Sequence, residues 1–369
     1  MERKLAHIEK IEWIKPIENA DSIELCGVLG WQCVIAKKDN FKVGDKVIYI
    51  EVDSVVPEKP EYEFLRDRKF RVRTIKLRGQ VSQGLVIPLR ECTYDIGEDM
   101  TEVLGITKYL SPSEQSELQK EEEKIKLEKS KLKKYLMRYS FFRNIFLGKK
   151  QKSSFPYWVS KTDEERIQNL GDNFIQQNAE TMVYVTEKID YQSGTWTSKT
   201  VPRFSGLLSK LIPITKTLFV VASRNLQNFD KDSLYWQIAK KYDLERICRV
   251  NPDIIIQGEQ GNTKVQGNKY KISEPKMWVF NIIVDNEFLN YDEMKQFCIL
   301  EGLDYVPLVR KCKMKDIGST VNDFVEFSKG KSTIANIHRE GVVIRCIEDG
   351  KKVFSFKCIN PDFLLKYEE

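Results

Sequence analysis

A tight turn near the C-terminal end of the chain is the feature that most constrains its fold. The dipeptide Asp349-Gly350 separates two runs rich in β-branched and aromatic residues, 341–348 and 351–357. Asp-Gly between such runs is the strongest short-range signal for a two-residue β-hairpin. We therefore expect the C-terminal part of the chain to be built on an antiparallel sheet.

The register of this hairpin makes a prediction about side chains. Counting back from the turn places Val342 opposite Lys357. Residues two apart on a strand share a face, so Glu340 and Lys357 should lie on the same side of the sheet. Phe354 and Phe356 should then point to the other side, into a core. The turn alone thus predicts a carboxylate next to a cation.

The composition is that of a globular chain large enough for two domains. It has 369 residues, of which 41% are hydrophobic and 31% charged. No apolar run approaches the ~20 residues that span a bilayer, and residues 1–4 lead into a mixed-charge strand pattern rather than a signal peptide. The eight cysteines form no Cys-x-x-Cys pair, and there are only two histidines. We expect reduced thiols, no zinc, no membrane partner, a monomer, and an intracellular location, cytoplasmic by default.

Residues 1–108 predict a small all-β barrel of the OB type. Short strand patterns alternate with turn signals, and helical patterns are few. Residues 66–78 hold seven Lys/Arg and one Asp. Arg71 and Arg73 are therefore candidates for contact with an RNA backbone, although charges also protect a solvated edge strand. The expected strands are 23–28, 31–37, 46–52, 70–77 and 85–89.

Residues 109–154 predict a charged helical arm that links two domains. The range 111–154 carries 12 Lys/Arg and 6 Asp/Glu, which equals the whole net charge of +6. Its apolar residues recur seven apart. Such a helix can lie on RNA, on a membrane surface or on its own protein. Lys133 and Lys134 are candidate RNA contacts.

Residues 155–369 predict an α+β domain with antiparallel sheets. No Gly-x-x-x-x-Gly-Lys and no Gly-x-Gly-x-x-Gly sequence is present, which disfavours a P-loop or dinucleotide fold. The expected strands are 182–190, 218–224, 253–259, 277–284, 341–347 and 352–357. The expected helices are 163–170, 233–248, 291–301 and 323–327.

A Lys-x-Asp pair follows the β-branched strand 182–186, and residues 191–194 are expected to turn the backbone. Strand alternation projects Lys188 and Asp190 to one side. Taken alone, this pair is more typical of a solvated strand end, because an ion pair on the surface contributes little to folding stability. Further segments downstream strengthen the functional interpretation of Lys188 and Asp190. These are 223–225, 257–259 followed by 265–270, 278–282, 339–345 and 354–357.

In order and spacing, these segments resemble the covalent nucleotidyltransferases, and among them the RNA ligases that carry an N-terminal OB module. The segments 78–85 and 161–169 share the resemblance, which covers nearly the whole chain. One position departs from the pattern: Tyr191 stands where Lys-x-Asp is usually followed by glycine.

The resemblance implies a set of roles. Lys188 would be the nucleophile that takes AMP from ATP, and it would need a lowered pKa, from burial or neighbouring cations, to be uncharged. Asp190, Glu259 and Glu340 would bind Mg²⁺ or Mn²⁺, with Glu259 also near the ribose. The remaining members of the implied nucleotide site are Glu187, Ile189, Arg224 on phosphate, Phe280 on adenine, and Lys357 as a catalytic cation.

The implied function is an ATP-dependent RNA ligase that seals 3′-OH and 5′-phosphate ends through lysyl-AMP. Its partner would be a nicked or broken RNA duplex, or an RNA/DNA hybrid. One alternative is an inactive RNA-binding protein of the same fold. Another is a DNA ligase or GTP-using capping enzyme, but these generally place the OB domain after the last lysine motif. Here only 12 residues follow Lys357.

Overall fold

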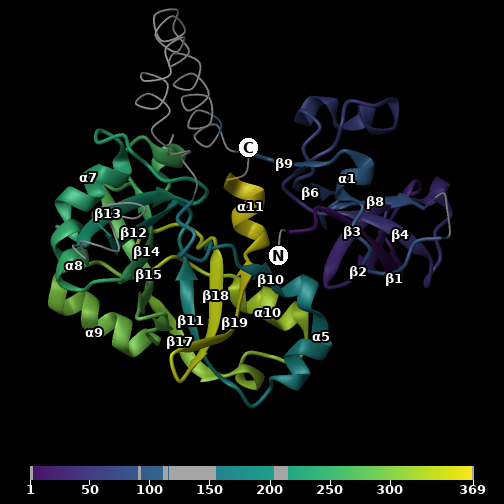
Figure 1. Cartoon of the computed structure of the whole chain (residues 1–369). Helices are drawn as coiled ribbons and strands as arrows, with labels where there is room; N and C mark the ends of the chain where they lie inside the picture. The colour runs from purple at the N-terminus through teal and green to yellow at the C-terminus, as the bar shows by residue number, and fades with distance from the viewer. Residues whose placement is uncertain (1–2, 90–92, 111–114, 116–154, 203–214, 368–369) are drawn as a thin grey trace, which may run out of the picture.

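A computed structural model describes residues 3–89, 93–110, 115, 155–202 and 215–367. Figure 1 shows two lobes: an N-terminal β-rich domain on the right, and a larger domain on the left that runs to the C-terminus. We call them the barrel domain (described residues 3–110) and the α+β domain (155–367). Of the expected arm, 109–154, the structure describes only residues 109, 110 and 115, so Lys133 and Lys134 lie outside the described residues.

The barrel domain is an antiparallel OB-like half-barrel, as predicted. Its main sheet has the order β3-β2-β1-β4-β8. Alternation decides which side chains turn inward: in β3, Trp31, Cys33 and Ile35 are buried and the residues between them are not. The elements are β1 (Ala6–Pro16), β2 (Ile23–Val28), β3 (Trp31–Ala36), η1 (Lys37–Asp39), β4 (Lys46–Ile50), β5 (Ser54–Val55), η2 (Pro60–Arg68), β6 (Thr74–Leu77), β7 (Gln80–Gln83), β8 (Leu85–Pro88), α1 (Thr101–Leu104) and β9 (Thr107–Lys108).

The strand expected over 70–77 is shorter in the structure. Only β6 is extended, because Lys69 and Phe70 adopt left-handed backbone conformations with φ of 52° and 58°. These residues end η2 and turn the chain before the strand begins. Arg71 and Arg73 therefore lie between η2 and β6 rather than on a regular edge strand.

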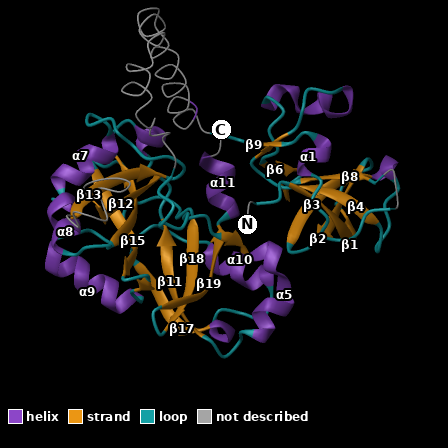
Figure 2. Ribbon diagram, in the orientation of Figure 1, coloured by secondary structure: helices purple, strands orange, loops and turns teal. Residues whose placement is uncertain are grey.

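The α+β domain contains two five-stranded sheets. One has the order β10-β19-β18-β11-β17 and the other β13-β12-β14-β15-β16. All pairs are antiparallel except β10 with β19. Figure 2 shows the two sheets side by side, with helices on their outer sides. The strands are β10 (Glu165–Arg166), β11 (Met182–Lys188), β12 (Gln192–Pro202), β13 (Thr215–Ser223), β14 (Ile255–Gly261), β15 (Lys276–Val284), β16 (Glu287–Phe288), β17 (Leu308–Lys313), β18 (Gly341–Glu348) and β19 (Lys351–Ile359).

Helices close a separate core over each sheet. α5 and α10 pack on the β11–β18–β19 sheet, with Phe324 and Phe356 fully buried between them. α7, α8 and α9 pack on the other sheet around Trp196. Asn290 starts α9 with a capping box, which satisfies amides of the first turn. The helices are α5 (Ile167–Gln177), α7 (Leu234–Lys241), α8 (Leu244–Val250), α9 (Tyr291–Glu301), α10 (Val321–Ser328) and α11 (Pro361–Tyr367), with η3 (Val265–Asn268) and η4 (Met314–Asp316).

Three local predictions were wrong in this domain. The helix expected over 163–170 begins later, because Glu165 and Arg166 pair with β19. The helix expected over 233–248 is two helices, because Asp243 has a φ of 49° between them. The turn expected over 191–194 is the start of β12 from residue 192 onward. In each case tertiary pairing or one backbone conformation overrides the local pattern.

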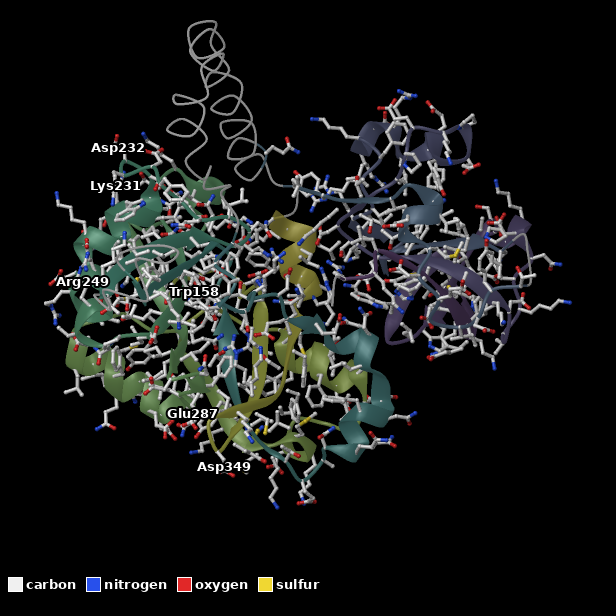
Figure 3. All side chains as sticks on the ribbon, in the orientation of Figure 1. Trp158, Lys231, Asp232, Arg249, Glu287 and Asp349 are labelled. Carbon is white, nitrogen blue, oxygen red and sulfur yellow. The ribbon has the colours of Figure 1, made fainter. Side chains whose placement is uncertain are left out.

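The C-terminal hairpin forms at its predicted turn, but its register differs. Glu348 pairs with Lys351, and a bulge then leaves Val353 as an extra residue, so Lys357 lies opposite Val343 and not Val342. Phe354 and Phe356 do pack into the core, as predicted. The turn also meets the second sheet: the amide of Phe288 donates to the carbonyl of Gly350 at 2.7 Å. Figure 3 labels Glu287 and Asp349 at this contact.

Candidate active site

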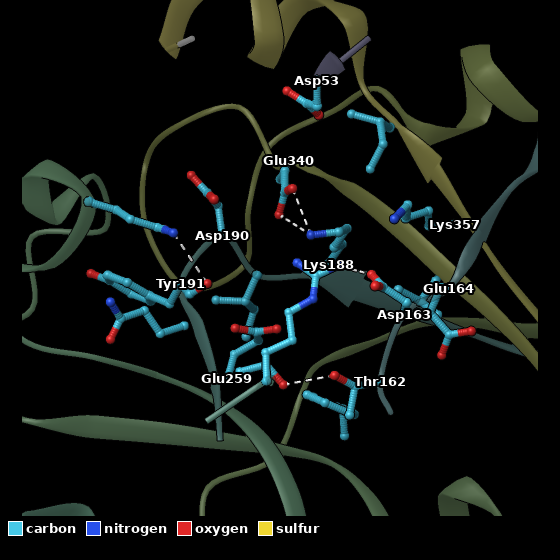
Figure 4. Close-up of a pocket in the computed structure, with 18 of the residues that line it drawn as sticks. Asp53, Thr162, Asp163, Glu164, Lys188, Asp190, Tyr191, Glu259, Glu340 and Lys357 are labelled. Carbon is cyan, nitrogen blue, oxygen red and sulfur yellow. Dashed lines mark hydrogen bonds and ion pairs between the residues drawn. The ribbon is translucent and has the colours of Figure 1, made fainter. Parts of the chain in front are cut away.

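The main pocket lies where the chain passes from one sheet to the other. β11 ends at Lys188, residues 189–191 cross over, and β12 begins the second sheet. A cavity of about 350 Å³ opens at this crossover. Figure 4 shows Lys188 at its centre, with Asp190, Glu259, Glu340 and Lys357 around it. The fold thus gathers residues that are far apart in the sequence.

Lys188 is held by a carboxylate. Its Nζ donates to both carboxylate oxygens of Glu340 at 2.7 Å. Burial lowers the pKa of Lys188, but Glu340, Glu259 and Asp190 raise it, and the net pKa is above the ordinary lysine value. The expectation of a lowered pKa is therefore wrong for the protein without ligands, because carboxylates and not cations are its nearest charges. In this state Lys188 is an ammonium.

Glu340 reaches the pocket for a reason the hairpin register did not predict. It precedes β18, and its neighbour Gly341 has a φ of 156°. A Cβ at Gly341 would collide with the backbone carbonyl of Cys358. Only glycine fits that close approach of two strands. The backbone at Gly341 thus brings Glu340 to the pocket even though Lys357 pairs one residue further along.

Asp190 has a cationic partner of its own. Its carboxylate forms an ion pair with Lys269, next to η3. The backbone amide of Asp190 donates to the hydroxyl of Tyr270 at 2.9 Å. Lys269 was not among the predicted site residues, although it lies within the segment 265–270 that formed part of the resemblance. These contacts fix the crossover segment directly after Lys188.

Glu259 carries a buried oxygen that no described residue hydrogen-bonds. Burial raises its pKa to about 8, with Lys188 acting against this effect and Glu340 adding to it. Its Oε2 is buried and has no hydrogen-bond partner among the described residues. Without a ligand, this carboxyl group therefore binds a proton more readily than an ordinary glutamate does. Such an oxygen is suited to a ligand or cation that enters the pocket.

The three predicted metal-binding carboxylates do not form a preassembled metal centre. Within the described ranges, no group of three or more His, Cys, Asp and Glu side chains is arranged to hold a metal ion. In this structure Glu340 is paired with Lys188, and Asp190 is paired with Lys269. Oε2 of Glu259 has no hydrogen-bond partner in the part of the chain that the structure describes. The donor set suits a hard cation that brings ligand phosphates and water with it, which is how Mg²⁺ is usually bound.

Tyr191 stands at the position where glycine usually follows Lys-x-Asp, but its side chain does not fill the pocket. Its ring lies parallel to that of Trp278, and its hydroxyl donates to Asn268 at 3.0 Å. Gly261 leaves room for the ring, because a Cβ there would overlap it. Tyr191 is thus a packed wall of the pocket, with 6% of its surface exposed.

The remaining predicted nucleotide-site residues also line the pocket. They are Glu187, Ile189, Arg224, Phe280 and Lys357. Glu187 is buried and accepts from the amide and hydroxyl of Thr333. Arg224 forms an ion pair with Asp163, and Phe280 lies under the guanidinium of Arg345 at 5.5 Å. Burial, followed by the charges of Arg166 and Lys188, holds the pKa of Lys357 well below its usual range.

Sequence reasoning missed the contribution of the barrel domain. Arg3, Asp53 and Tyr109 line the same pocket as Lys188, and so does Arg71. Arg71 was predicted to hold RNA on an open groove, but it points into this pocket with only 12% of its side chain exposed. Arg73 is not among the lining residues. Arg166 lies within the segment 161–169 that shared the resemblance, and it was the one residue in the sequence that could have pointed to this part of the pocket.

The barrel domain is attached at this point by specific hydrogen bonds. The indole of Trp31 donates to Oδ1 of Asn169 at 2.8 Å, and Nδ2 of Asn169 donates to Glu51 at 2.6 Å. The amide of Gly30 donates to the carbonyl of Gln168 at 3.1 Å. Residues 168 and 169 of the α+β domain therefore help to hold the barrel domain beside the pocket.

A lysine at the end of a strand, in a pocket between two antiparallel sheets and beside an OB-like barrel, defines the class of the covalent nucleotidyltransferases. Comparison with known proteins is consistent with this class. Residues 5–89 match the family model of an OB-fold domain, and residues 181–359 match that of RNA ligase. The chain belongs to the RNA ligase family, with an OB-fold domain at its N-terminal end.

Solved structures of the Naegleria gruberi RNA ligase resemble the whole chain. The form with PPi has a TM-score of 0.76 and 29% identity over 99% of both chains. A lysine-to-alanine variant with ATP and Mn has a TM-score of 0.76 and 28% identity, and a lysine-to-methionine variant with AMP and Mn a TM-score of 0.76 and 29% identity, each over 99% of both chains. No curated protein sequence matches. Among the described residues, no helix is both long and apolar enough to cross a membrane.

Proposed function

We propose that this RNA ligase uses ATP to join a 3′-hydroxyl to a 5′-phosphate, through AMP bound covalently to Lys188. The observation that carries the proposal is the Lys188 Nζ, 2.7 Å from both oxygens of Glu340 at the centre of the pocket. The ATP- and AMP-containing structures of the Naegleria enzyme support the choice of nucleotide. The substrate would be a nicked or broken RNA duplex, or an RNA/DNA hybrid.

The chemistry needs three displacements at phosphorus. Once Lys188 has lost its proton to solvent, its amine attacks the α-phosphorus, so that a P–N bond forms and pyrophosphate leaves. An oxygen of the RNA 5′-phosphate then attacks that phosphorus, and the P–N bond breaks. Finally the 3′-hydroxyl attacks the 5′-phosphate and AMP leaves. Lys357 and Arg224 would stabilise charge on the phosphates, and Phe280 would stack on adenine.

A Mg²⁺ or Mn²⁺ ion would be held by Glu259, Glu340 and Asp190 together with ligand phosphates, and would neutralise developing negative charge. The unpartnered Oε2 of Glu259 supports this assignment. We also propose an intracellular, cytoplasmic location for a monomer. The seven cysteines in the described residues are all free and buried, as in a reducing compartment.

The test is protein labelling with α-labelled ATP or GTP in the presence of Mg²⁺. We expect acid-labile label on the protein with ATP only, and none on Lys188→Ala. Lys231→Ala, a substitution outside the pocket, serves as the control and should label normally. Absence of label on the wild type would favour the inactive RNA-binding protein, and label from GTP would favour a capping enzyme. Sealing assays on nicked RNA, DNA and hybrid duplexes then identify the polynucleotide.

A further inference from the structure

The lysine that is paired with Asp190 has no role in the proposal above. The ammonium of Lys269 donates to the carboxylate of Asp190. Asp190 lines the cavity, whereas Lys269 is not among the described residues that line it. Both side chains are largely buried, with exposed fractions of 21% for Lys269 and 19% for Asp190. Lys269 is thus placed to act on the pocket through the carboxylate that it holds.

The backbone of the segment 265–270 is fixed against the crossover segment. The hydroxyl of Tyr270 accepts from the amide of Asp190 at 2.9 Å, and the side chain of Asn268 accepts from the hydroxyl of Tyr191 at 3.0 Å. Asn268 has a φ of 47°, a left-handed conformation that is uncommon for residues other than glycine. Such a conformation persists where the surrounding contacts determine it. Lys269 therefore meets Asp190 from a fixed position.

Two aromatic rings of the C-terminal helix α11 also contact the ammonium of Lys269. Its Nζ lies 5.1 Å from the centroid of the Phe363 ring and 5.9 Å from that of the Tyr367 ring. The two rings pack on each other with centroids 4.8 Å apart. The face of an aromatic ring attracts a cation within about 6 Å. The rings thus hold Lys269 beside Asp190 without competing for its charge, as a second carboxylate would.

The helix that carries these rings is attached to the backbone of Glu340. Asn360, directly before α11, is fully buried. Its backbone amide donates to the carbonyl of Glu340 at 2.8 Å, and its side-chain amide donates to the carbonyl of Arg339 at 2.9 Å. Figure 1 shows α11 between the two domains, where it also contacts β6. One short helix is therefore bonded to the segment of one catalytic carboxylate and packed on the cation that holds another.

The positive charge of Lys269 compensates carboxylates that repel one another. Burial raises the pKa of Glu340, Asp190 raises it further, and Lys188 and Lys269 act against both effects. In the proposed reaction the uncharged nitrogen of Lys188 bonds to the α-phosphorus while pyrophosphate leaves. The positive charge of Lys188 is then no longer available to the carboxylates. Lys269 is not consumed, and its attraction for Asp190 keeps that carboxylate in the pocket.

We propose that Lys269 is a positioning residue for the transfer of AMP to Lys188, and that it acts by holding the carboxylate of Asp190. The rings of Phe363 and Tyr367 keep it in place, so the C-terminal helix takes part in the reaction at one remove. The inference rests on the proposed function, because it assigns a further residue to the same step.

The test measures the rate at which full-length protein is labelled, over a range of concentrations of α-labelled ATP at saturating Mg²⁺. Lys269→Met keeps most of the side-chain length and removes the charge. The maximal rate should fall about tenfold or more, because a misplaced carboxylate slows the displacement. The ATP concentration that gives half of this rate should change less than about threefold. Lys269→Arg keeps a cation and should restore part of the rate. Lys264→Met, at an exposed lysine of the same loop, is the matched control and should be labelled like the wild type.

The role of the rings is tested by combining substitutions. Replacing Phe363 and Tyr367 together by Leu should lower the maximal rate several-fold. The same change should slow Lys269→Met no further, because the rings act through the lysine. If the double variant does not fold, Tyr367→Phe should still retain more of the rate than Tyr367→Leu, because it keeps a ring.

Three results would count against the proposal. An unchanged rate in Lys269→Met, or an equal loss in Lys269→Arg and Lys269→Met, overturns the positioning role. Additive losses from the rings and the lysine overturn the role of α11. If the wild type itself takes no label from ATP, the proposed function fails instead, and this outcome is distinct from a labelled wild type with an equally labelled Lys269→Met.

Discussion

The ring of Tyr191 lies parallel to the ring of Trp278, with an interplanar angle of 7° and centroids 5.8 Å apart. This stack sits directly after the Lys-x-Asp pair, at the position where the family pattern has glycine. The structure therefore assigns the unusual residue to packing between the crossover segment and the second sheet.

Replacing Tyr191 should destabilise the fold more than it changes the chemistry. Tyr191→Gly removes a buried ring and should lower the free energy of unfolding by about 3–5 kcal/mol. Tyr191→Phe loses only the hydrogen bond to Asn268 and should cost about 1 kcal/mol. Urea denaturation measures both. Equal stability of Tyr191→Gly and the wild type would contradict the packing role.

The pairing of Lys188 with Glu340 predicts a pH dependence. Because the pKa of Lys188 lies above the ordinary lysine value, the free amine should appear only in alkaline solution. Glu340→Gln removes the negative charge and leaves the burial, so the pKa of Lys188 should fall. Competitive acetylation across pH, quantified by mass spectrometry, follows this titration without relying on ligation. An exposed lysine such as Lys331 provides the internal reference, and an unchanged Lys188 profile in Glu340→Gln would refute the assignment.

His7 should make stability depend on pH. Burial lowers its pKa, but hydrogen bonds to Glu51 and Glu9 raise it to about 9 overall. A raised pKa stabilises the folded state fully below the unfolded value of about 6.5, and this stabilisation is lost as pH rises to about 9. The wild type should therefore lose about 1–3 kcal/mol more than His7→Gln between these pH values. Denaturant titrations at several pH values measure the difference, and His338→Gln shows the effect of removing the other histidine.

The charge of residues 111–152 predicts a role in RNA binding. Deleting this range removes 12 Lys/Arg and 6 Asp/Glu. RNA affinity should fall and its dependence on salt should become flatter, because fewer phosphates are neutralised. Adenylylation of Lys188 should change less. Filter binding at several salt concentrations measures the slope, and a Gly/Ser segment of equal length controls for the missing linker. Equal loss of both activities would indicate a structural role instead.

Local sequence chemistry determined much of this protein. The Asp349-Gly350 turn predicted the hairpin, and the strand patterns predicted most strands of both domains, because turn conformation and side-chain alternation depend on neighbouring residues. The ordered motifs identified the lysine, carboxylates and phenylalanine that now line one pocket. The resemblance covered both domains, so the class of protein was predictable as well.

Tertiary structure decided the rest, because it depends on groups that are distant in the chain. The bulge at Val353 changed the hairpin register, and Gly341 nevertheless brought Glu340 to Lys188. The charge of Lys188 follows from carboxylates supplied by other strands. Asp53 and Arg166 are 113 residues apart, and no local pattern pairs them. Burial and ion pairing act through space, so only the packed fold places the barrel domain inside the active site.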